Sequence, residues 1–325
     1  MNAQLFVMKY LLPLLLFFPF FCLSQSNFER AEVYFLQEKF DVAKPLFQSY
    51  LEKHPNNLKT KEYLGDIASY SSDWETAIDY YKDLVAIDAF SANYHFKYGG
   101  ATSMKALKIS KVRALLYVSD IKEAFETAAS LDPMHIETRW ALVEFYIQLP
   151  RLLGGSEAKA IEYANQLAEI SPVDGYLAKG YIAEYTERPL DAENFYKKAI
   201  EVGGSIHTYE KLSKLYEKNN QPEEAIETSA RSLKAHKRNQ LNYQIGKISA
   251  QYNIDHQLGL ESLEEYVKNH SVKDGVPKDW AYFRMAQIYK NLGMKENALL
   301  WIDMALNSRP DFKEAQEEKR IIRAL

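Results

Sequence analysis

The feature that most constrains this chain is a recurrence of small residues about every 34 positions. The pattern is clearest around eight anchor positions, and six of these have Gly, Ala or Ser twelve positions earlier. The anchors are Ala43, Ala77, Ile121, Ala160, Ala192, Ala225, Leu258 and Ala298, with spacings of 34, 44, 39, 32, 33, 33 and 40. Self-similarity at such a period is typical of stacked repeats, each of which buries its apolar face against its neighbours. We therefore expect one solenoid rather than two globular domains.

The other recurring positions predict that each repeat is a pair of antiparallel helices. Small residues twelve positions apart let two helix backbones approach closely where they cross. An aromatic residue stands four positions after several anchors, at Phe47, Tyr81, Phe125 and Tyr196. Proline stands twelve positions after others and ends the second helix, at Pro55, Pro133, Pro172 and Pro310. The chain has only 13 Gly and 11 Pro among 325 residues, which also favours long helices over a turn-rich β fold.

These positions resemble the tetratricopeptide repeat (TPR). The clearest matches are WETAIDYYKDLVAID (74–88), PLDAENFYKKAIEV (189–202) and MAQIYKNLGMKENALLWIDMALNSRP (285–310). The resemblance implies an all-α fold, a right-handed α-α superhelix of about eight hairpins over residues 26–310. The charged segment 311–325 is expected to be a helix that caps the stack. The sixth and seventh repeats depart from the pattern, because Ser229 and Ser262 replace the aromatic residue. These repeats are expected to be bent or shifted by one residue.

The third repeat carries an insertion near residues 103–113, within a stretch that has no acidic residue between Asp88 and Asp120. Possible anion contacts there are Lys105, Lys108, Lys111 and Arg113. The alternative is a solvated extension of a helix.

The fourth repeat carries an insertion near residues 149–156, which ends in Gly154-Gly155-Ser156. Backbone N–H groups at such a helix start can bind an anion, so Arg151 and Ser156 are also possible anion contacts. A long loop with a helix cap is the structural alternative. Residues 93–175 resemble an atypical TPR subgroup that includes periplasmic helical proteins associated with TRAP-type solute transporters.

The first 25 residues are expected to be a secretory signal peptide. Lys9 precedes an apolar run over residues 10–23, which is too short for a membrane helix and ends in Cys22-Leu23-Ser24. An uncleaved anchor and a lipid attached to Cys22 are the alternatives. Cleavage near residue 25 would remove the only Cys, and the mature chain would have no membrane span. The predicted location is periplasmic or secreted.

No sequence pattern indicates catalysis or a bound metal. No two of the seven His lie three or four positions apart, and the HExxH, GxSxG and calcium-loop motifs are absent. The chain is therefore predicted not to be an enzyme and to need no cofactor or metal. A net charge of −4 also argues against a nucleic-acid partner. A hydrolase with an unrecognised site stays a minor alternative.

The leading hypothesis is an exported TPR scaffold that binds a protein or peptide in its concave groove. In the TPR-like arrangement the first helix of each pair lines this groove. The side chains expected there are Trp140, Glu144, Tyr181, Tyr185, Tyr243 and Phe283. Aromatic side chains with polar edges are frequent binding anchors. The alternative for each of these residues is a structural role, in which it packs against its neighbours. The alternative function is a small-molecule-binding or transporter-accessory protein of the periplasm. The oligomeric state is left open.

Overall fold

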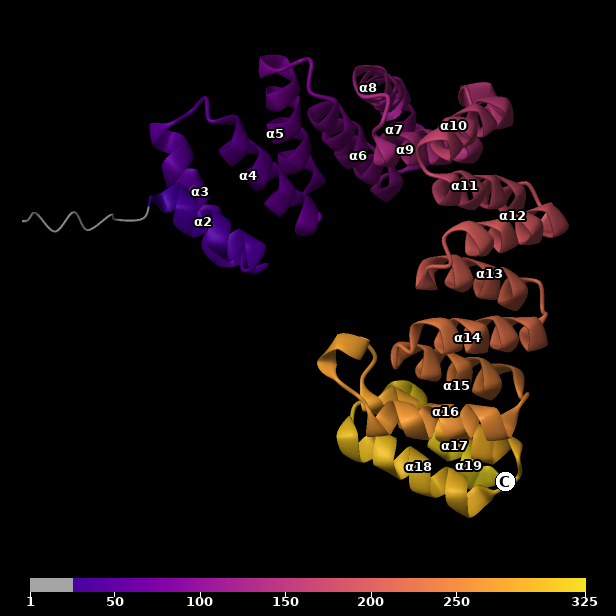
Figure 1. Ribbon diagram of the computed structural model, residues 1–325. Helices are drawn as coiled ribbons and strands as arrows, with labels where there is room; N and C mark the ends of the chain where they lie inside the picture. The colour runs from indigo at the N-terminus through magenta and orange to yellow at the C-terminus, as the bar shows by residue number, and fades with distance from the viewer. Residues whose placement is uncertain (1–25) are drawn as a thin grey trace, which may run out of the picture. The chain divides into compact units, whose positions relative to one another are not determined.

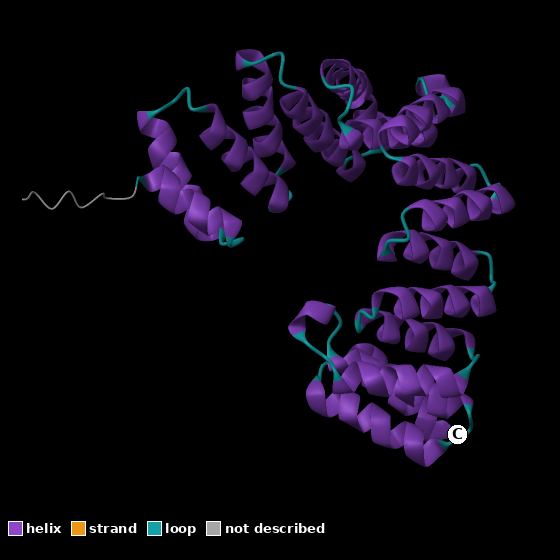
Figure 2. Cartoon of the chain, viewed as in Figure 1, coloured by secondary structure: helices purple, strands orange, loops and turns teal. Residues whose placement is uncertain are grey.

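The computed structural model describes residues 26–325, and this part of the chain is helical throughout, with no strand (Figures 1 and 2). The predicted all-α class is confirmed. The segment predicted to be a signal peptide lies outside the described residues. The helices divide into two compact units, of which the first ends at Pro133 and the second covers Met134–Leu325. We describe each unit by itself.

The first unit consists of three helical hairpins. Its helices are α2 (Asn27–Leu36), α3 (Phe40–Lys53), α4 (Leu58–Tyr70), α5 (Trp74–Ile87), α6 (Ala92–Lys108), the short α7 (Lys111–Ala114), η1 (Leu115–Tyr117) and α8 (Val118–Leu131). Helices α2 and α3, α4 and α5, and α6 and α8 pack as pairs, and each pair packs on the next. The insertion expected near residues 103–113 corresponds to the end of α6, α7 and the start of the connection to α8.

The second unit consists of five hairpins and a final helix. Its helices are α9 (Ile136–Gln148), η2 (Arg151–Leu153), α10 (Glu157–Ile170), α11 (Pro172–Tyr185), α12 (Pro189–Val202), α13 (Ile206–Lys218), α14 (Pro222–His236), α15 (Gln240–Tyr252), α16 (His256–Lys268), η3 (Val272–Asp274), α17 (Lys278–Asn291), α18 (Lys295–Ser308) and α19 (Lys313–Ala324). Successive helices pack side by side, and α19 packs on α18 and α17 through Ala315 and Ile322. The two units together contain the eight hairpins that the recurrence predicts.

Five of the eight hairpins close with the same three-residue turn. The middle residue of each has a positive φ, between 56° and 71°: Glu38, Ser72, Glu187, Asn220 and Gly293. The next residue then donates a backbone hydrogen bond to the carbonyl five positions earlier, as Asp73 does to Ala68 over 2.9 Å. This left-handed closure satisfies a carbonyl at the end of the first helix and reverses the chain. A shared turn gives these hairpins a common geometry, although only one of the five middle residues is glycine.

The recurring aromatic residue packs directly on the small residue of the first helix. A methyl group added at Gly65 would lie 2.6 Å from the ring of Tyr81, and one added at Gly180 would lie 2.4 Å from the ring of Tyr196. Real Cβ atoms do not approach other atoms this closely, so these two first helices need glycine opposite the ring. This pairing explains why the two positions recur together in the sequence.

In the two irregular repeats, other side chains form the contact between the first and second helices. In the sixth repeat, Ser213 and Ser229 replace the glycine and the ring, and their hydroxyl groups lie 3.1 Å apart in the core. In the seventh, the prediction of Leu258 as the anchor is wrong by one residue, because Leu258 is 37% exposed and Gly259 is buried. Leu263 then lies against Gly246, where a methyl group would be 2.2 Å from Leu263 Cγ.

The physical reason for this shift is the turn before α16. Asn253 and Asp255 both have positive φ, 59° and 45°, in place of the single left-handed residue of the regular turn. The second helix therefore begins with a different phase, and its buried face starts one residue later.

Candidate functional site

The six residues predicted to line a binding groove all lie in the second unit, on the first helices of its hairpins. Trp140 and Glu144 belong to α9, Tyr181 and Tyr185 to α11, Tyr243 to α15 and Phe283 to α17. We call the series α9, α11, α13, α15 and α17 the first-helix row of this unit. The repeats stack these helices in order (Figure 1), so equivalent positions recur along the row.

A pair of tyrosines at the junction of α9 and α11 presents polar edges to solvent. The amide of Gln148 donates a 2.7 Å hydrogen bond to the Tyr181 hydroxyl, and the hydroxyl of Tyr185 donates to the Gln148 carbonyl over 3.5 Å. The two rings lie 6.4 Å apart, and Tyr185 is 49% exposed. This junction combines apolar ring surface with exposed polar groups, a composition that suits a binding anchor.

Glu144 lies near this tyrosine pair and has no hydrogen bond or ion pair among residues 26–325. Its side chain reaches solvent, yet the surrounding chain removes enough water to raise the pKa of the carboxyl above its ordinary value. The charge of Lys211 on α13 partly opposes this rise. Burial also raises the pKa of Tyr181. Side chains from α9, α11 and α13 therefore share one partly desolvated electrostatic environment.

A second feature of the row is a pocket of about 320 Å³ between α15, α17 and the loop that follows η3. Its lining residues are Tyr243, Lys247, Gly275, Val276, Pro277, Trp280 and Arg284. We call it the Arg284 pocket. The Arg284 guanidinium carbon lies 5.8 Å from the ring centre of Trp280, and its Nη1 donates to the side chain of Gln287. Its Nε is buried without a hydrogen-bond partner.

The charges in the Arg284 pocket are unequally balanced. Lys247 Nζ lies 3.4 Å from a carboxylate oxygen of Glu217, whereas no carboxylate of residues 26–325 lies within ion-pair distance of Arg284. A guanidinium beside aromatic rings and without an acidic partner is suited to hydrogen-bond a carboxylate or carbonyl of a ligand.

Two of the predicted groove residues have structural contacts. Phe283 is only 5% exposed and packs 5.3 Å from the ring of Phe312 in the core, so it does not line the accessible surface. Trp140 is half-buried, and its indole N–H donates a 2.8 Å hydrogen bond to Asp174 at the start of α11.

The residues that the sequence analysis did not single out include Gln148, Trp280 and Arg284. Lys247 directly follows Gly246, as Tyr181 directly follows Gly180, so the two side chains stand at equivalent positions of their repeats. Gln148 gave no such signal, because its role depends on the contact between α9 and α11.

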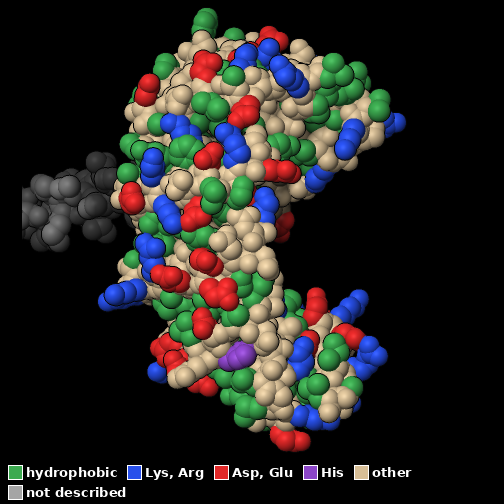
Figure 3. Space-filling view, turned by 90° about the vertical axis from the view of Figure 1, so that its right-hand side faces the viewer, with side chains coloured by type: hydrophobic (Ala, Val, Ile, Leu, Met, Phe, Trp, Pro, Cys, Tyr) green, Lys and Arg blue, Asp and Glu red, His purple; other side chains and the backbone are tan. Residues whose placement is uncertain are grey.

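The basic residues predicted as anion contacts lie in both units. In the first unit, Lys105 lies 3.2 Å from Glu75, Lys108 lies over the ring of Trp74, and Lys111 and Arg113 are exposed on α7. Figure 3 shows basic and acidic side chains interspersed over one face of the molecule.

In the second unit, Arg151 is exposed on η2 and Ser156 caps α10. The N–H groups of Gly154, Gly155 and Ser156 all donate to backbone carbonyls, at 3.1, 3.2 and 2.9 Å. These three N–H groups are therefore already satisfied within the loop.

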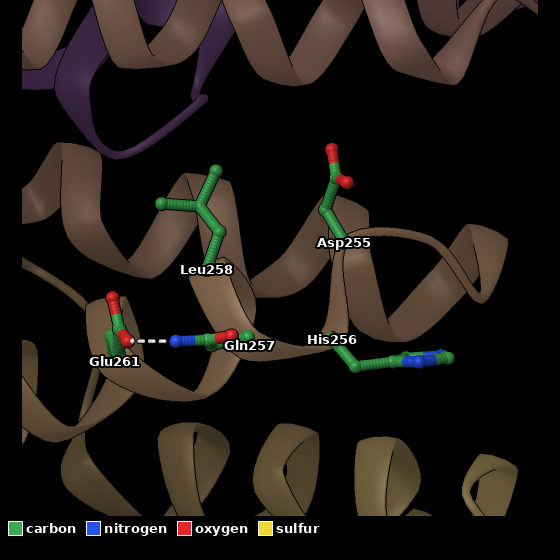
Figure 4. A pocket seen from close by; sticks show the side chains of 5 residues that line it. All are labelled: Asp255, His256, Gln257, Leu258 and Glu261. Atoms are coloured by element: carbon green, nitrogen blue, oxygen red, sulfur yellow. Dashed lines mark hydrogen bonds between the residues drawn. The ribbon is translucent and has the colours of Figure 1, made fainter.

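A larger hollow of about 450 Å³ lies on α16 and is lined by Asp255, His256, Gln257, Leu258 and Glu261. Figure 4 shows Gln257 hydrogen-bonded to Glu261, over 2.9 Å, while the ring of His256 points away from that carboxylate. The His256 ring instead contacts Asn253, with 2.8 Å between Nε2 and Oδ1. The hollow therefore holds no His–carboxylate pair that would activate a nucleophile.

Within residues 26–325, no group of three or more His, Cys, Asp or Glu side chains is arranged to hold a metal ion. In the same part of the chain, no helix combines the length and the apolar character needed to cross a membrane.

Comparison with known proteins agrees with the repeat geometry. Sequence profiles of the tetratricopeptide repeat match residues 25–57 and 281–312, which correspond to the first and last hairpins. These two hairpins are therefore similar to the tetratricopeptide repeat. No curated protein matches the sequence significantly.

The solved structures that match the chain have low sequence identity to it. A TPR protein from Parabacteroides merdae is 14% identical with a TM-score of 0.48, and the match covers 91% of this chain and 97% of that one. YrrB, described as a TPR protein with an unusual peptide-binding site, is 18% identical with a TM-score of 0.43, over 61% of this chain and 98% of its own. MamA is 23% identical with a TM-score of 0.43, over 53% and 92%.

Proposed function

We propose that the protein is an exported, non-catalytic TPR scaffold that binds an extended segment of a protein or peptide along the first-helix row of its second unit. The observation that carries this proposal is the Arg284 pocket, where a guanidinium without an acidic partner lies beside Trp280 and Tyr243. Arginine and large aromatic side chains are enriched at the energetic centres of protein interfaces.

The remainder of the row suits the same kind of ligand. Tyr185 offers exposed ring surface, and Glu144 offers a carboxylate whose raised pKa indicates that it lacks a compensating partner. A peptide with an acidic or carbonyl group near Arg284 and a basic or donor group near Glu144 would satisfy both. Export rests on the charge and apolar pattern of residues 1–25.

The alternative function, binding of a small anionic molecule at the loop 149–156, is less well supported. Its predicted anion donors, the N–H groups of Gly154 to Ser156, already bond to backbone carbonyls. A free anion would have to displace these bonds.

The binding proposal is tested with a photo-crosslinking residue in place of Tyr185, in the full-length chain within its own cells. The matched control replaces Tyr70 of α4, which is also exposed, at 67%. We expect a discrete crosslinked partner from position 185 and none from position 70. A peptide taken from the crosslinked region should then lose about tenfold or more in affinity when Arg284 is changed to Ala. Arg320→Ala, at an exposed position of α19, should leave the affinity unchanged.

Equal crosslinking from both positions, or equal affinity for the Arg284→Ala and Arg320→Ala proteins, would contradict binding along this row. Export is tested separately, by cell fractionation and N-terminal sequencing of the mature chain. Recovery of unprocessed protein from the cytoplasm alone would contradict export without affecting the binding proposal.

A further inference from the structure

One hairpin connection differs from the others in length and chemistry. The regular turns are three residues long and polar, such as Ser71-Ser72-Asp73 and Asn219-Asn220-Gln221. Between α6 and α8, by contrast, the chain passes through α7 and η1 and carries a run of apolar and basic side chains. We call residues 107–117 the basic tip.

The apolar side chains of the basic tip are exposed. Leu107 is 74% exposed, and Val112 and Leu116 are each 78% exposed, although η1 itself packs against α6 and α8. Single exposed apolar residues are ordinary on protein surfaces. Three large ones within ten residues, on a connection that is polar in most other hairpins, are an exception that indicates an interaction surface.

The charge of the basic tip has one sign. Lys108, Lys111 and Arg113 have no carboxylate of residues 26–325 within ion-pair distance, whereas the neighbouring Lys105 is 3.2 Å from Glu75. The sequence also has no acidic residue between Asp88 and Asp120. The tip therefore presents three uncompensated positive charges among exposed apolar side chains.

We propose that the basic tip docks on the anionic surface of a lipid bilayer. Leu107, Val112 and Leu116 would enter the boundary between head groups and acyl chains, and the three cations would contact anionic head groups. Interfacial binding combines these two contributions, buried apolar area and attraction between basic side chains and anionic lipids. A protein partner would also bury these apolar side chains, so binding to protein-free vesicles is the observation that distinguishes a lipid surface from it.

The docking surface is independent of the first-helix row, because it lies in the first unit and the Arg284 pocket lies in the second. Binding at the bilayer would hold the scaffold at a membrane surface without a spanning segment.

The test measures partition of the full-length chain onto phosphatidylcholine vesicles with and without phosphatidylglycerol, by flotation. We expect Lys111→Glu combined with Arg113→Glu to lower partition onto the anionic vesicles by about 25-fold or more, at about fivefold for each cation lost. Val112→Ser combined with Leu116→Ser should lower it by about tenfold, since two apolar side chains no longer become buried. High salt should weaken the binding of the unaltered chain.

A matched control carries the same charge change elsewhere in the first unit, Lys44→Glu with Lys53→Glu on exposed positions of α3. This control should change partition by less than about threefold, because its side chains have no exposed apolar cluster beside them. The apolar segment 10–23 is common to all the variants, so it contributes equally to each measurement.

Two results would overturn the proposal. One is equal partition of the tip variant and the α3 control. The other is unchanged partition of the Val112→Ser/Leu116→Ser protein, which would indicate a charge-only surface of the kind that an acidic protein recognises. Arg284→Ala should leave vesicle binding unchanged, so failure here and failure of the peptide-binding proposal are distinguishable.

Discussion

The first helices of the two units share a repeat geometry but differ in how their polar groups are satisfied. In the first unit, Lys97 Nζ lies 2.7 Å from Glu62 Oε1 and 2.7 Å from Asp66 Oδ1, and Asn93 donates to Glu62 over 3.0 Å. The Tyr81 hydroxyl also donates to Asp66, over 2.7 Å. Every member of this group, which we call the Lys97 network, therefore has a partner within the unit.

On the first helices of the second unit, two polar groups lack such partners. Glu144 has no ion pair or hydrogen bond within the described chain, and Arg284 Nε is buried without an acceptor. The difference indicates that the Lys97 network stabilises the stack, while the open groups are available to a ligand. A buried polar atom without a partner, such as Arg284 Nε, costs free energy that a hydrogen bond to a ligand would recover.

The largest expected effect comes from breaking the Lys97 network. Lys97→Met would leave two carboxylates, about 10% and 20% exposed, without their main partner, and should lower the free energy of unfolding by about 2–3 kcal/mol. Urea unfolding measures the loss, and hydrogen exchange should locate it in α4 and α6. Lys247→Met, in the second unit, removes a single 3.4 Å ion pair and should cost less than about 1 kcal/mol. Equal losses would remove the distinction between the units.

Unfolding measured as a function of pH should show that the charges of the Lys97 network stabilise the first unit. Burial alone would raise the pKa of Glu62, but hydrogen bonds and charges from Lys97 and Lys59 outweigh it, and the pKa lies below its ordinary value of 4.5. The stabilisation is therefore present above pH 4.5 and is lost as the pH falls through the lowered pKa. Glu62→Gln should cost about 1–2 kcal/mol at neutral pH and little in strong acid. A cost that is independent of pH would show that Glu62 does not stabilise the unit through its charge.

Much of the fold could be predicted from the sequence because the repeat pattern is a packing rule. Gly65 and Tyr81 recur as a pair since one makes room for the other, and the same spacing located Gly180 and Tyr196. Leu258 was misassigned because the phase of α16 depends on the two left-handed residues of the preceding turn. The middle position of this turn is Ile254, a β-branched residue that disfavours positive φ, and the flanking Asn253 and Asp255 adopt it instead.

The site was harder to predict than the fold. The expectation that first-helix side chains line the groove selected Tyr181 and Tyr185, which lie on α11, but it also selected Phe283, whose ring is in the core. Tyr243 and Phe283 each stand three positions before the small residue of their first helix, so the sequence does not distinguish them, yet Phe283 is buried and Tyr243 is only half-buried. Trp280 and Arg284 became recognisable only when the loop after η3 supplied the third wall of the pocket.

Removing single hydroxyl groups compares the two units through smaller expected losses of stability. Tyr81→Phe removes the donor to Asp66 and the contact with Ser69, over 3.1 Å, in a buried setting, and should cost about 1 kcal/mol. Tyr181→Phe removes an acceptor from the solvent-exposed amide of Gln148 and should cost less than about 0.5 kcal/mol. Thermal unfolding of the two single variants compares these losses. A larger loss for Tyr181→Phe would place the tighter polar network in the second unit.

The smallest expected effect has the opposite sign. Because the pKa of Glu144 is raised in the folded chain, its ionisation is less favourable there than in the unfolded chain. The free-energy cost of this ionisation is absent below the ordinary pKa of 4.5 and is fully present above the raised pKa. Glu144→Gln should therefore slightly increase the free energy of unfolding at neutral pH and leave it unchanged in acid. The matched change Glu210→Gln, on exposed α13, breaks only a surface pair with Lys214 and should give no increase. A loss of stability on changing Glu144 would mean that its carboxylate already has a partner in the folded chain. Arg284 would then be the one group of the pair that lacks a partner on the first-helix row.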